Sequence, residues 1–364
     1  MAYTDIDDPS AYFHTQLYTG NATARSITND ANAGDFKPDF LWIKVRNNAN
    51  NHRMFDSSRG HAEDLKSNLT EGGEASTDRC TGFDANGFSL GNNAEVNSNT
   101  HNIVAWQWKV NGGTTTTNDA SVTGIGDIDS VIQANQTAGI SLVTYTGTDT
   151  AGETFAHGLG AIPDMVIIKR RGADGDAWAV QLATTLGNTN ALRLNETAVY
   201  GGGNGVGFWN DTSPTSTVMS LGDRAEVNSA STNTYMAYFF KSIQGYSKIG
   251  SYVGNGTGAN SAADGTFVYT GFKPAWVMAK ATTVAQGWNM FDNTRTPTNE
   301  MGAFLFADTA DAETTGYDSM DFLSNGFKLR KNLNGANDSG QTYIYMAFAE
   351  HPFVSSEGVP TTAR

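Results

Sequence analysis

The amino-acid sequence repeats one order of landmarks three times, and this repetition limits the possible folds more than any other feature. In each block a proline leads an apolar stretch that ends in a lysine, at residues 38–44, 163–169 and 274–280. Lys44 and Lys169 are 125 positions apart, and Lys169 and Lys280 are 111 apart. These spacings have the size of a domain and exceed the repeat of a solenoid protein. The sequence therefore predicts three tandem copies of one domain.

The blocks agree in three further landmarks. Each opens with an aromatic-x-Gly turn, continues after the lysine with an aromatic strand, and closes on an apolar strand built around an alanine. The turns lie at residues 18–20, 145–147 and 252–254, the aromatic strands at 54–56, 178–180 and 290–292, and the closing strands at 103–106, 235–238 and 345–348. Blocks one and two also share Ala-Glu-Val-Asn-Ser, whereas blocks one and three share Asn-Gly-Phe-x-Leu. Because different pairs share different features, chance does not explain the similarity.

The composition favours an all-β fold. Charged residues make up only 16% of the 364 residues and Gly reaches 40, so short strands joined by turns are expected rather than long helices. Residues 40–43 and 165–168 are continuously apolar, which predicts strands covered on both faces. The predicted fold is three tandem antiparallel β-sandwich domains, jelly-roll-like in type, with the connection order left open. Residues 60–66 are the best short helix candidate and fit a loop equally well.

The landmarks set the domain boundaries. We expect sandwich repeat 1 at 1–112, a Gly/Thr/Asn-rich connector at 113–138, repeat 2 at 139–243, repeat 3 at 244–350 and a C-terminal tail at 351–364. The short junction between repeats 2 and 3 predicts a fixed mutual orientation, with repeat 1 freer unless its connector docks. The tail is expected either as a loose end or as a strap that docks on a neighbour.

Charge and cysteine content exclude several classes of protein. A net charge of −14 argues against nucleic-acid binding, because phosphate neutralisation needs clustered Lys and Arg. No apolar run is long enough for a membrane-spanning helix, and the start has no basic segment followed by an apolar one, so neither membrane insertion nor secretion is expected. Cys80 is the single cysteine, which excludes an intrachain disulfide and fits synthesis in a reducing cytoplasm.

The histidines give no sign of a metal or catalytic site. They stand at positions 14, 52, 61, 101, 157 and 351, and none has a second His or Cys at a zinc-ligand spacing. His157, between Phe155 and two glycines, is interpreted as a turn histidine that hydrogen-bonds a neighbouring loop. The prediction is therefore no catalytic residue, no metal ligand and no cofactor.

Two recurring acid-base pairs are interpreted in the same way. Asp56 with Arg59 and Asp292 with Arg295 share the spacing Asp-x-x-Arg, and repeat 2 lacks the pair, with Val180 and Gln181 at the corresponding stretch. A charged pair that ends a strand and holds the following loop explains this better than half an active site. A glycosidase needs two carboxylates facing across a cleft, and the scattered acids do not define such a pair. The candidates are Glu71, Glu74, Asp311 and Glu313.

Three weaker candidates complete the set. The glycines at 201–205 lack the Lys-Ser/Thr of a phosphate-binding loop, so a surface hairpin is favoured. Calcium binding stays open without a twelve-residue ligand loop to support it; the clustered acids are Asp5, Asp7 and Asp8, and Asp308 with Asp311. Trp209 follows a glycine-rich stretch and suits either stacking on a sugar or, as favoured here, the end of a sandwich core.

Several long strings resemble a known family. They are residues 4–13, 245–254, 267–278, 321–330 and 342–350, among them Gly-Tyr-Ser-Lys-Ile-Gly-Ser-Tyr-Val-Gly and Asp-Phe-Leu-Ser-Asn-Gly-Phe-Lys-Leu-Arg. The chain resembles a family of virion structural proteins of tailed phages, of the marine phage type, with tandem tail-fibre-like domains of unknown function. The resemblance covers nearly the whole chain.

The resemblance implies a role in the virion after synthesis in the host cytoplasm. The function it favours is that of a tail fibre or fibre-tip component engaged in host attachment, without enzymatic activity. The alternatives are a capsid decoration protein on the head surface and a carbohydrate-active enzyme. The implied partners are other virion proteins, copies of the chain itself as a homotrimer, and a host surface glycan. The absence of heptads or short repeats departs from a full-length fibre with a slender shaft.

Overall fold

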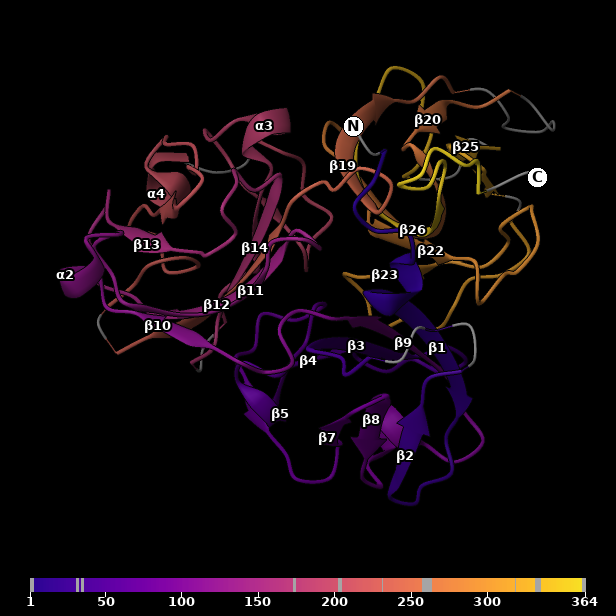
Figure 1. Cartoon of the computed structure of the whole chain (residues 1–364), viewed down its shortest axis with the longest axis horizontal. Helices are drawn as coiled ribbons and strands as arrows, with labels where there is room; N and C mark the ends of the chain where they lie inside the picture. The colour runs from indigo at the N-terminus through magenta and orange to yellow at the C-terminus, as the bar shows by residue number, and fades with distance from the viewer. Residues whose placement is uncertain are drawn as a thin grey trace.

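The elements of the chain are almost all strands. The computed structural model describes residues 3–30, 33, 36–172, 175–201, 205–230, 232–256, 264–317, 319–330 and 335–361. The helices in these residues are single turns, namely η1 (Pro9–Ala11), α1 (Ala94–Asn97), α2 (Ala120–Thr123), α3 (Ala183–Leu186) and α4 (Gly205–Trp209). Every ladder between the named strands is antiparallel, so the predicted all-β class is confirmed (Figure 1). In the described part of the chain, none of the helices has the length and apolarity needed to cross a membrane.

Each repeat pairs one large sheet with one small sheet. In repeat 1 the large sheet has the order β1-β9-β3-β4-β5-β6 and the small sheet the order β2-β8-β7. The bounds are β1 (Phe13–Thr19), β2 (Arg25–Thr28), β3 (Phe40–Val45), β4 (Arg53–Asp56), β5 (Gly60–Leu65), β6 (Glu74–Ala75), β7 (Cys80–Asp84), β8 (Gly87–Leu90) and β9 (Asn102–Trp108).

Repeats 2 and 3 follow the same plan. Their large sheets have the orders β10-β11-β12-β18-β14-β15-β16 and β19-β26-β21-β22-β23, and their small sheets β13-β17 and β20-β25-β24. Repeat 2 contains β10 (Thr116–Asn118), β11 (Ser130–Asn135), β12 (Ile140–Thr146), β13 (Thr154–Ala156), β14 (Met165–Arg170), β15 (Ala179–Gln181), β16 (Leu192–Arg193), β17 (Val218–Ser220) and β18 (Thr234–Phe240). Repeat 3 contains β19 (Ser247–Val253), β20 (Phe267–Tyr269), β21 (Phe272–Ala281), β22 (Trp288–Asp292), β23 (Leu305–Phe306), β24 (Met320–Leu323), β25 (Gly326–Leu329) and β26 (Thr342–Pro352).

Strand pairing places the landmark lysines at equivalent positions. Lys44 lies opposite Val104, Lys169 opposite Met236 and Lys280 opposite Ile344, each on an inner strand of its large sheet. The same pairing shows that two landmarks were aligned two residues away from their true equivalents: the closing strand of repeat 3 and the aromatic strand of repeat 2. Because Trp42 faces Trp106, Ile167 faces Tyr238 and Met278 faces Met346, the equivalent of Trp106 in repeat 3 is Met346. The equivalent of Asp56 and Asp292 in repeat 2 is likewise Leu182, one residue beyond Gln181, which pairs with Val166.

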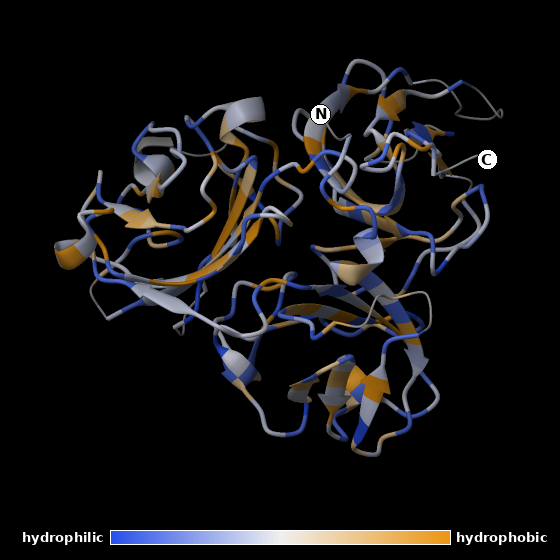
Figure 2. Ribbon diagram, in the orientation of Figure 1, coloured by the Kyte–Doolittle hydropathy of each residue, from blue (hydrophilic) through white to orange (hydrophobic). Residues whose placement is uncertain are grey.

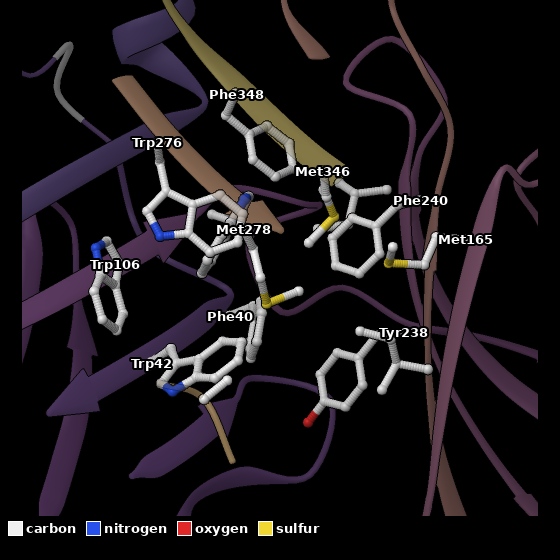
Figure 3. Close-up of a cluster of buried hydrophobic side chains, with 14 of the residues drawn as sticks. Phe40, Trp42, Trp106, Met165, Tyr238, Phe240, Trp276, Met278, Met346 and Phe348 are labelled. Carbon is white, nitrogen blue, oxygen red and sulfur yellow. The ribbon is translucent and has the colours of Figure 1, made fainter. Parts of the chain in front are cut away.

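Each large sheet is buried on both faces, which explains its continuously apolar central strand. Leu41 and Ile43 of β3 point into the core between the two sheets of repeat 1. Phe40 and Trp42, on the other face, enter a second core that also receives Tyr238 of repeat 2. Figure 1 shows the three large sheets turned toward a common centre, with the small sheets outside them. Figure 2 shows the apolar residues concentrated along these sheets, and Figure 3 shows side chains of all three repeats meeting in the shared core.

Repeat 1 was expected to be freer unless its connector docks, and the connector is docked. The expected connector at 113–138 is not a linker, because β10, α2 and β11 lie within it. β11 pairs with β12 along its length and so extends the large sheet of repeat 2. An extended sheet gains backbone hydrogen bonds that a free linker would leave to water. Repeat 1 is therefore packed against the other two repeats.

Two smaller expectations are also corrected. Residues 60–65 of the helix candidate form β5, because pairing with β4 and β6 satisfies their backbone groups. The tail continues β26 as far as Pro352 and then docks on its own chain. Phe353 N donates to Gly271 O at 3.2 Å, and Ser356 N donates to an Asp7 carboxylate oxygen at 2.6 Å. Residues 362–364 of the predicted tail lie outside the described residues.

Candidate functional site: the seams between repeats

The three repeats are joined by a ring of equivalent backbone hydrogen bonds. In each case an amide of one repeat donates to the carbonyl two residues beyond the landmark lysine of the next repeat. The contacts are Gly73 N to Arg171 O at 2.7 Å, Tyr200 N to Thr282 O at 2.8 Å, and Glu313 N to Arg46 O at 2.6 Å. The same contact therefore occurs three times in cyclic order, and the ring closes within one chain.

A second set of contacts runs around the ring in the opposite direction. Ring nitrogens at one equivalent position donate to backbone carbonyls of the neighbouring repeat. They are Trp178 Nε1 to Lys66 O at 2.9 Å, Trp288 Nε1 to Arg193 O at 2.8 Å, and His52 Nε2 to Phe306 O at 2.9 Å. His52 Nδ1 accepts from Trp42 Nε1, so Nε2 carries the proton, and burial holds the pKa of His52 well below its usual value. A neutral histidine thus takes the place of a tryptophan.

The landmark lysines belong to these seams. All three are at most 1% exposed, and burial lowers the pKa of each to about 8. Lys169 Nζ donates to Thr70 O of repeat 1 at 2.9 Å, and Lys280 Nζ donates to Thr197 O and Ala198 O of repeat 2. Lys44 Nζ donates to Val45 O at 2.6 Å. Buried lysines with carbonyl partners hold the backbone and do not reach a substrate.

The two Asp-x-x-Arg pairs form as expected and also reach across seams. The side chains of Asp56 and Arg59 are fully buried, as are those of Asp292 and Arg295, and each aspartate also accepts from the arginine backbone N–H. Tyr238 of repeat 2 donates its hydroxyl to Asp56 at 3.3 Å. Trp106 of repeat 1 donates Nε1 to Asp292 at 3.0 Å.

The third seam has no such polar pair. At this seam Met346 of repeat 3 takes the position of the donor, and Leu182 of repeat 2 takes the position of the aspartate. Both residues belong to the shared core. The repeat without the aspartate therefore faces the repeat without a donor. At the other two seams each aspartate accepts a hydrogen bond from the neighbouring repeat.

The remaining histidines stay apart from one another. His157 is buried in a turn, where its Nδ1 accepts from Leu159 N at 3.2 Å and burial lowers its pKa to about 4. Its Nε2 lies 3.2 Å from Thr215 O, which confirms the interpretation as a turn histidine. His14 lies beside Gln16 Oε1, and His61 Nδ1 beside Cys80 O. Within the described ranges, no three His, Cys, Asp or Glu side chains gather as metal ligands, including the histidines at 101 and 351 and Asp5.

Most of the candidate acids have a hydrogen-bond or ion-pair partner. Glu71 and Glu74 bind Lys66, and Glu313 binds Arg46 and Arg295. Asp8 accepts from Ser10 N at the start of η1, and Asp308 accepts from Trp288 N at 2.7 Å. Asp311 stands near Lys44, where its charge raises the pKa of the lysine against the effect of burial. The clustered acids are used as caps and ion-pair partners.

Trp209 is core, as favoured. It is 0% exposed, and its Nε1 donates to Asn190 O at 2.9 Å, so its ring is closed to a sugar. In the glycine stretch at 201–205, α4 begins at Gly205, and residues 202–204 lie outside the described residues, together with the expected hairpin.

One seam is hollow. A cavity of about 430 Å³ lies between repeats 3 and 1, lined on one side by Phe13 and Thr15 of β1 and on the other by Asn293 and Thr294. Sequence reasoning missed this cavity. A signal was present, since Thr15 is polar where the equivalent positions in repeats 2 and 3, both in the shared core, hold Leu142 and Ile249.

Fold and seams together define a class of protein: a single chain in which three antiparallel β-sandwich repeats close into a ring through polar seams. The chain belongs to the family described as "Domain of unknown function (DUF7483)", whose model matches residues 8–352. That match spans all three repeats as one unit, in agreement with their shared core. No curated protein and no solved structure matches the chain.

Proposed function

We propose that the chain is a structural protein of a tailed-phage virion, a tail-fibre or fibre-tip component that contacts the host surface and catalyses no reaction. The observation that carries the contact role is that the buried charged side chains serve contacts within the chain. Lys169, Lys280 and both Asp-x-x-Arg pairs make hydrogen bonds between repeats, and their side chains, like that of Lys44, are buried. A virion setting is supported by the resemblance of the sequence strings.

Repeat 3 carries the feature best suited to a host surface. Phe267 and Tyr269 of β20 are 44% and 55% exposed, on the outer side of a small sheet. The equivalent positions on β2 of repeat 1 are Ser26 and Thr28, since Ile27 and Val268 are the matched buried residues of these strands. Two neighbouring exposed rings suit stacking on the apolar face of a sugar, which supports a host glycan as the partner.

The ring also bears on assembly. Each of the three seams is bridged by a backbone hydrogen bond within one chain, so the three-fold arrangement needs no second copy. A homotrimer stays our expectation for the virion, and native mass measurement at micromolar concentration tests it.

Gold-labelled antibodies on intact phage particles test the position of the chain. We expect label on the tail; label over the head would support a decoration protein instead. Shortening of purified host polysaccharide by the chain would contradict the absence of catalysis.

Competition for adsorption tests the host contact. The purified chain should reduce phage adsorption to host cells, and the double variant Phe267→Ser with Tyr269→Thr should abolish this effect. Ser26→Ala with Thr28→Ala on the matched strand of repeat 1 serves as the control and should compete like the unchanged chain. Equal competition by both variants would refute the assignment to repeat 3.

A further inference from the structure

The chain contains its own example of a strand added at a seam. In repeat 2, β11 pairs with the outer edge of β12, and Gln133 of β11 stands opposite Leu142. The fully buried Gln133 side chain crosses into repeat 1. Its Nε2 donates to Ser57 Oγ at 3.0 Å and Ser58 Oγ at 2.8 Å, and its Oε1 accepts from Gly113 N at 2.8 Å.

The seam between repeats 2 and 3 is also filled by the chain. Ile243 exchanges backbone hydrogen bonds with Ser247 at the start of β19, at 3.1 and 2.8 Å. Ile249 N, further along the same edge, donates to Ser242 Oγ at 3.0 Å. The edge strand therefore has a partner at this seam as well.

The cavity takes the equivalent place at the seam between repeats 3 and 1. Asn293 corresponds to Ser57, because Asn293 N donates to Ala275 O as Ser57 N donates to Asp39 O. Thr294 therefore corresponds to Ser58. Both residues line the cavity, so the wall that receives Gln133 at one seam faces an open space at the other.

The opposite wall of the cavity is a sheet edge. β1 is the outermost strand of its sheet in the described part of the chain. Tyr12 O accepts from Lys109 N, and Gly20 N donates to His101 O. The backbone N–H and C=O groups of the even-numbered residues of this strand therefore point toward β9. The backbone groups of Phe13 and Thr15 therefore point away from β9, toward the side where β12 receives β11.

Thr15 adds an independent sign of a missing partner. Its side chain is 3% exposed, lines the cavity, and its hydroxyl has no hydrogen-bond partner. The equivalent Leu142 lies opposite Gln133. A buried hydroxyl without a partner is unfavourable, and an incoming polar side chain would supply the missing hydrogen bond.

We propose that β1 binds an extended polypeptide segment of a partner protein, antiparallel to β1, as β11 binds β12. A glutamine or asparagine of that segment stands opposite Thr15 and reaches Asn293 and Thr294. Main-chain hydrogen bonds to Phe13 and Thr15 provide affinity, and the carboxamide selects the register. This inference is independent of the virion assignment, because it rests on the repeats alone.

Hydrogen exchange on the full chain tests this inference. The probe is an end-blocked synthetic peptide with the sequence of residues 128–137, which contains β11. Saturating peptide should slow amide exchange at Phe13 and Thr15, while Leu142 stays protected by the chain's own β11. Replacing the peptide residue that corresponds to Gln133 with alanine should weaken binding about tenfold, as expected for the loss of its hydrogen bonds.

Three controls separate strand addition from other binding. A peptide N-methylated on the amides that face β1 should not bind, and Thr294→Ala in the chain should weaken binding. Thr28→Ala, on an exposed strand of the same repeat, should leave it unchanged. Equal affinity of the N-methylated peptide, or no protection at Phe13 and Thr15 at millimolar peptide, would overturn the proposal. Protection of these amides by host oligosaccharide and not by peptide would overturn it in favour of a sugar site.

Discussion

Replacing Asp56 with leucine tests whether the polar seams hold the ring together. In the structure the Asp56 carboxylate binds the Arg59 guanidinium and backbone N–H and accepts from Tyr238 of repeat 2. Asp56→Leu leaves a fully buried arginine with only the 3.3 Å contact to Glu63 as ion-pair partner, and removes the partner of the buried Tyr238 hydroxyl.

The expected loss follows from these two groups. Breaking a buried ion pair costs about 3 to 5 kcal/mol, and an unsatisfied hydroxyl adds about 1 kcal/mol or more. We therefore expect Asp56→Leu to lower the free energy of unfolding by about 4 to 6 kcal/mol. Tyr238→Phe, which removes only the hydroxyl, should cost about 1 kcal/mol.

Repeat 2 supplies the compensating change. Leu182 and Thr185 stand where repeat 1 has Asp56 and Arg59, and Met346 stands where repeat 2 has Tyr238. The triple variant Asp56→Leu, Arg59→Thr, Tyr238→Met also removes the guanidinium and the hydroxyl that lose their partner in Asp56→Leu. It should be within about 2 kcal/mol of the unchanged chain, because apolar replacement of a buried ion pair is often nearly neutral.

Urea unfolding followed by tryptophan fluorescence measures all three variants. Because the repeats share one core, we expect a single transition whose midpoint falls in the order unchanged chain, triple variant, Asp56→Leu. A loss below 1 kcal/mol for Asp56→Leu, or a triple variant as unstable as the single one, would refute the polar-seam reasoning.

Three further predictions concern the same buried groups. Lys44, Lys169 and Lys280 have a pKa of about 8 in the folded chain and about 10.4 in the unfolded chain. Between pH 8 and 9.5 the unfolded chain therefore holds more protons, and the free energy of unfolding should rise by about 1.5 kcal/mol per lysine. Urea titration at each pH checks this rise, and Lys→Met at all three positions should flatten it. His157 has its pKa lowered to about 4, so its contribution is complete above pH 6.5 and is lost as the pH falls toward 4, by up to about 3 kcal/mol, and His157→Gln should remove this acid sensitivity in the same titration. Trp178→Phe deletes the donor to repeat 1 and should lower the free energy of unfolding by about 1 to 2 kcal/mol, measured by the same unfolding assay, whereas an unchanged stability would contradict its role in the seam.

The sequence was sufficient to predict the three-fold repetition and the all-β class, because both depend on local pattern. The strand-ending lysines Lys44, Lys169 and Lys280 occupy equivalent places, as the repetition requires. The favoured interpretations of His157 and Trp209 were correct for simple reasons. His157 has no second His or Cys at a zinc-ligand spacing, and its ring is satisfied within a turn. Trp209 is a large aromatic residue, and such residues are usually mostly buried.

What the sequence did not predict depends on contacts between distant residues. Residues 113–138 have the composition of a linker, yet Gln133 is buried because it meets Ser57 and Ser58 of another repeat. The landmark strand at 178–180 is two residues out of register. A shift of two keeps every side chain on the same face of the strand, so hydrophobic patterning cannot detect it.

The polar seams also suggest why the three repeats share one chain. In a ring of identical subunits, all three seams would be the same, and each would need the same donor and acceptor. Here two seams join an aspartate to a tyrosine or tryptophan donor, and the third joins leucine to methionine. Any exchange in the order of the repeats would set a buried aspartate against methionine, or a buried donor against leucine, at a cost of about 1 to 3 kcal/mol for each unpaired group. The differences between repeats therefore specify one cyclic order, and they allow one seam to remain open for a partner while the other two are closed by the chain itself.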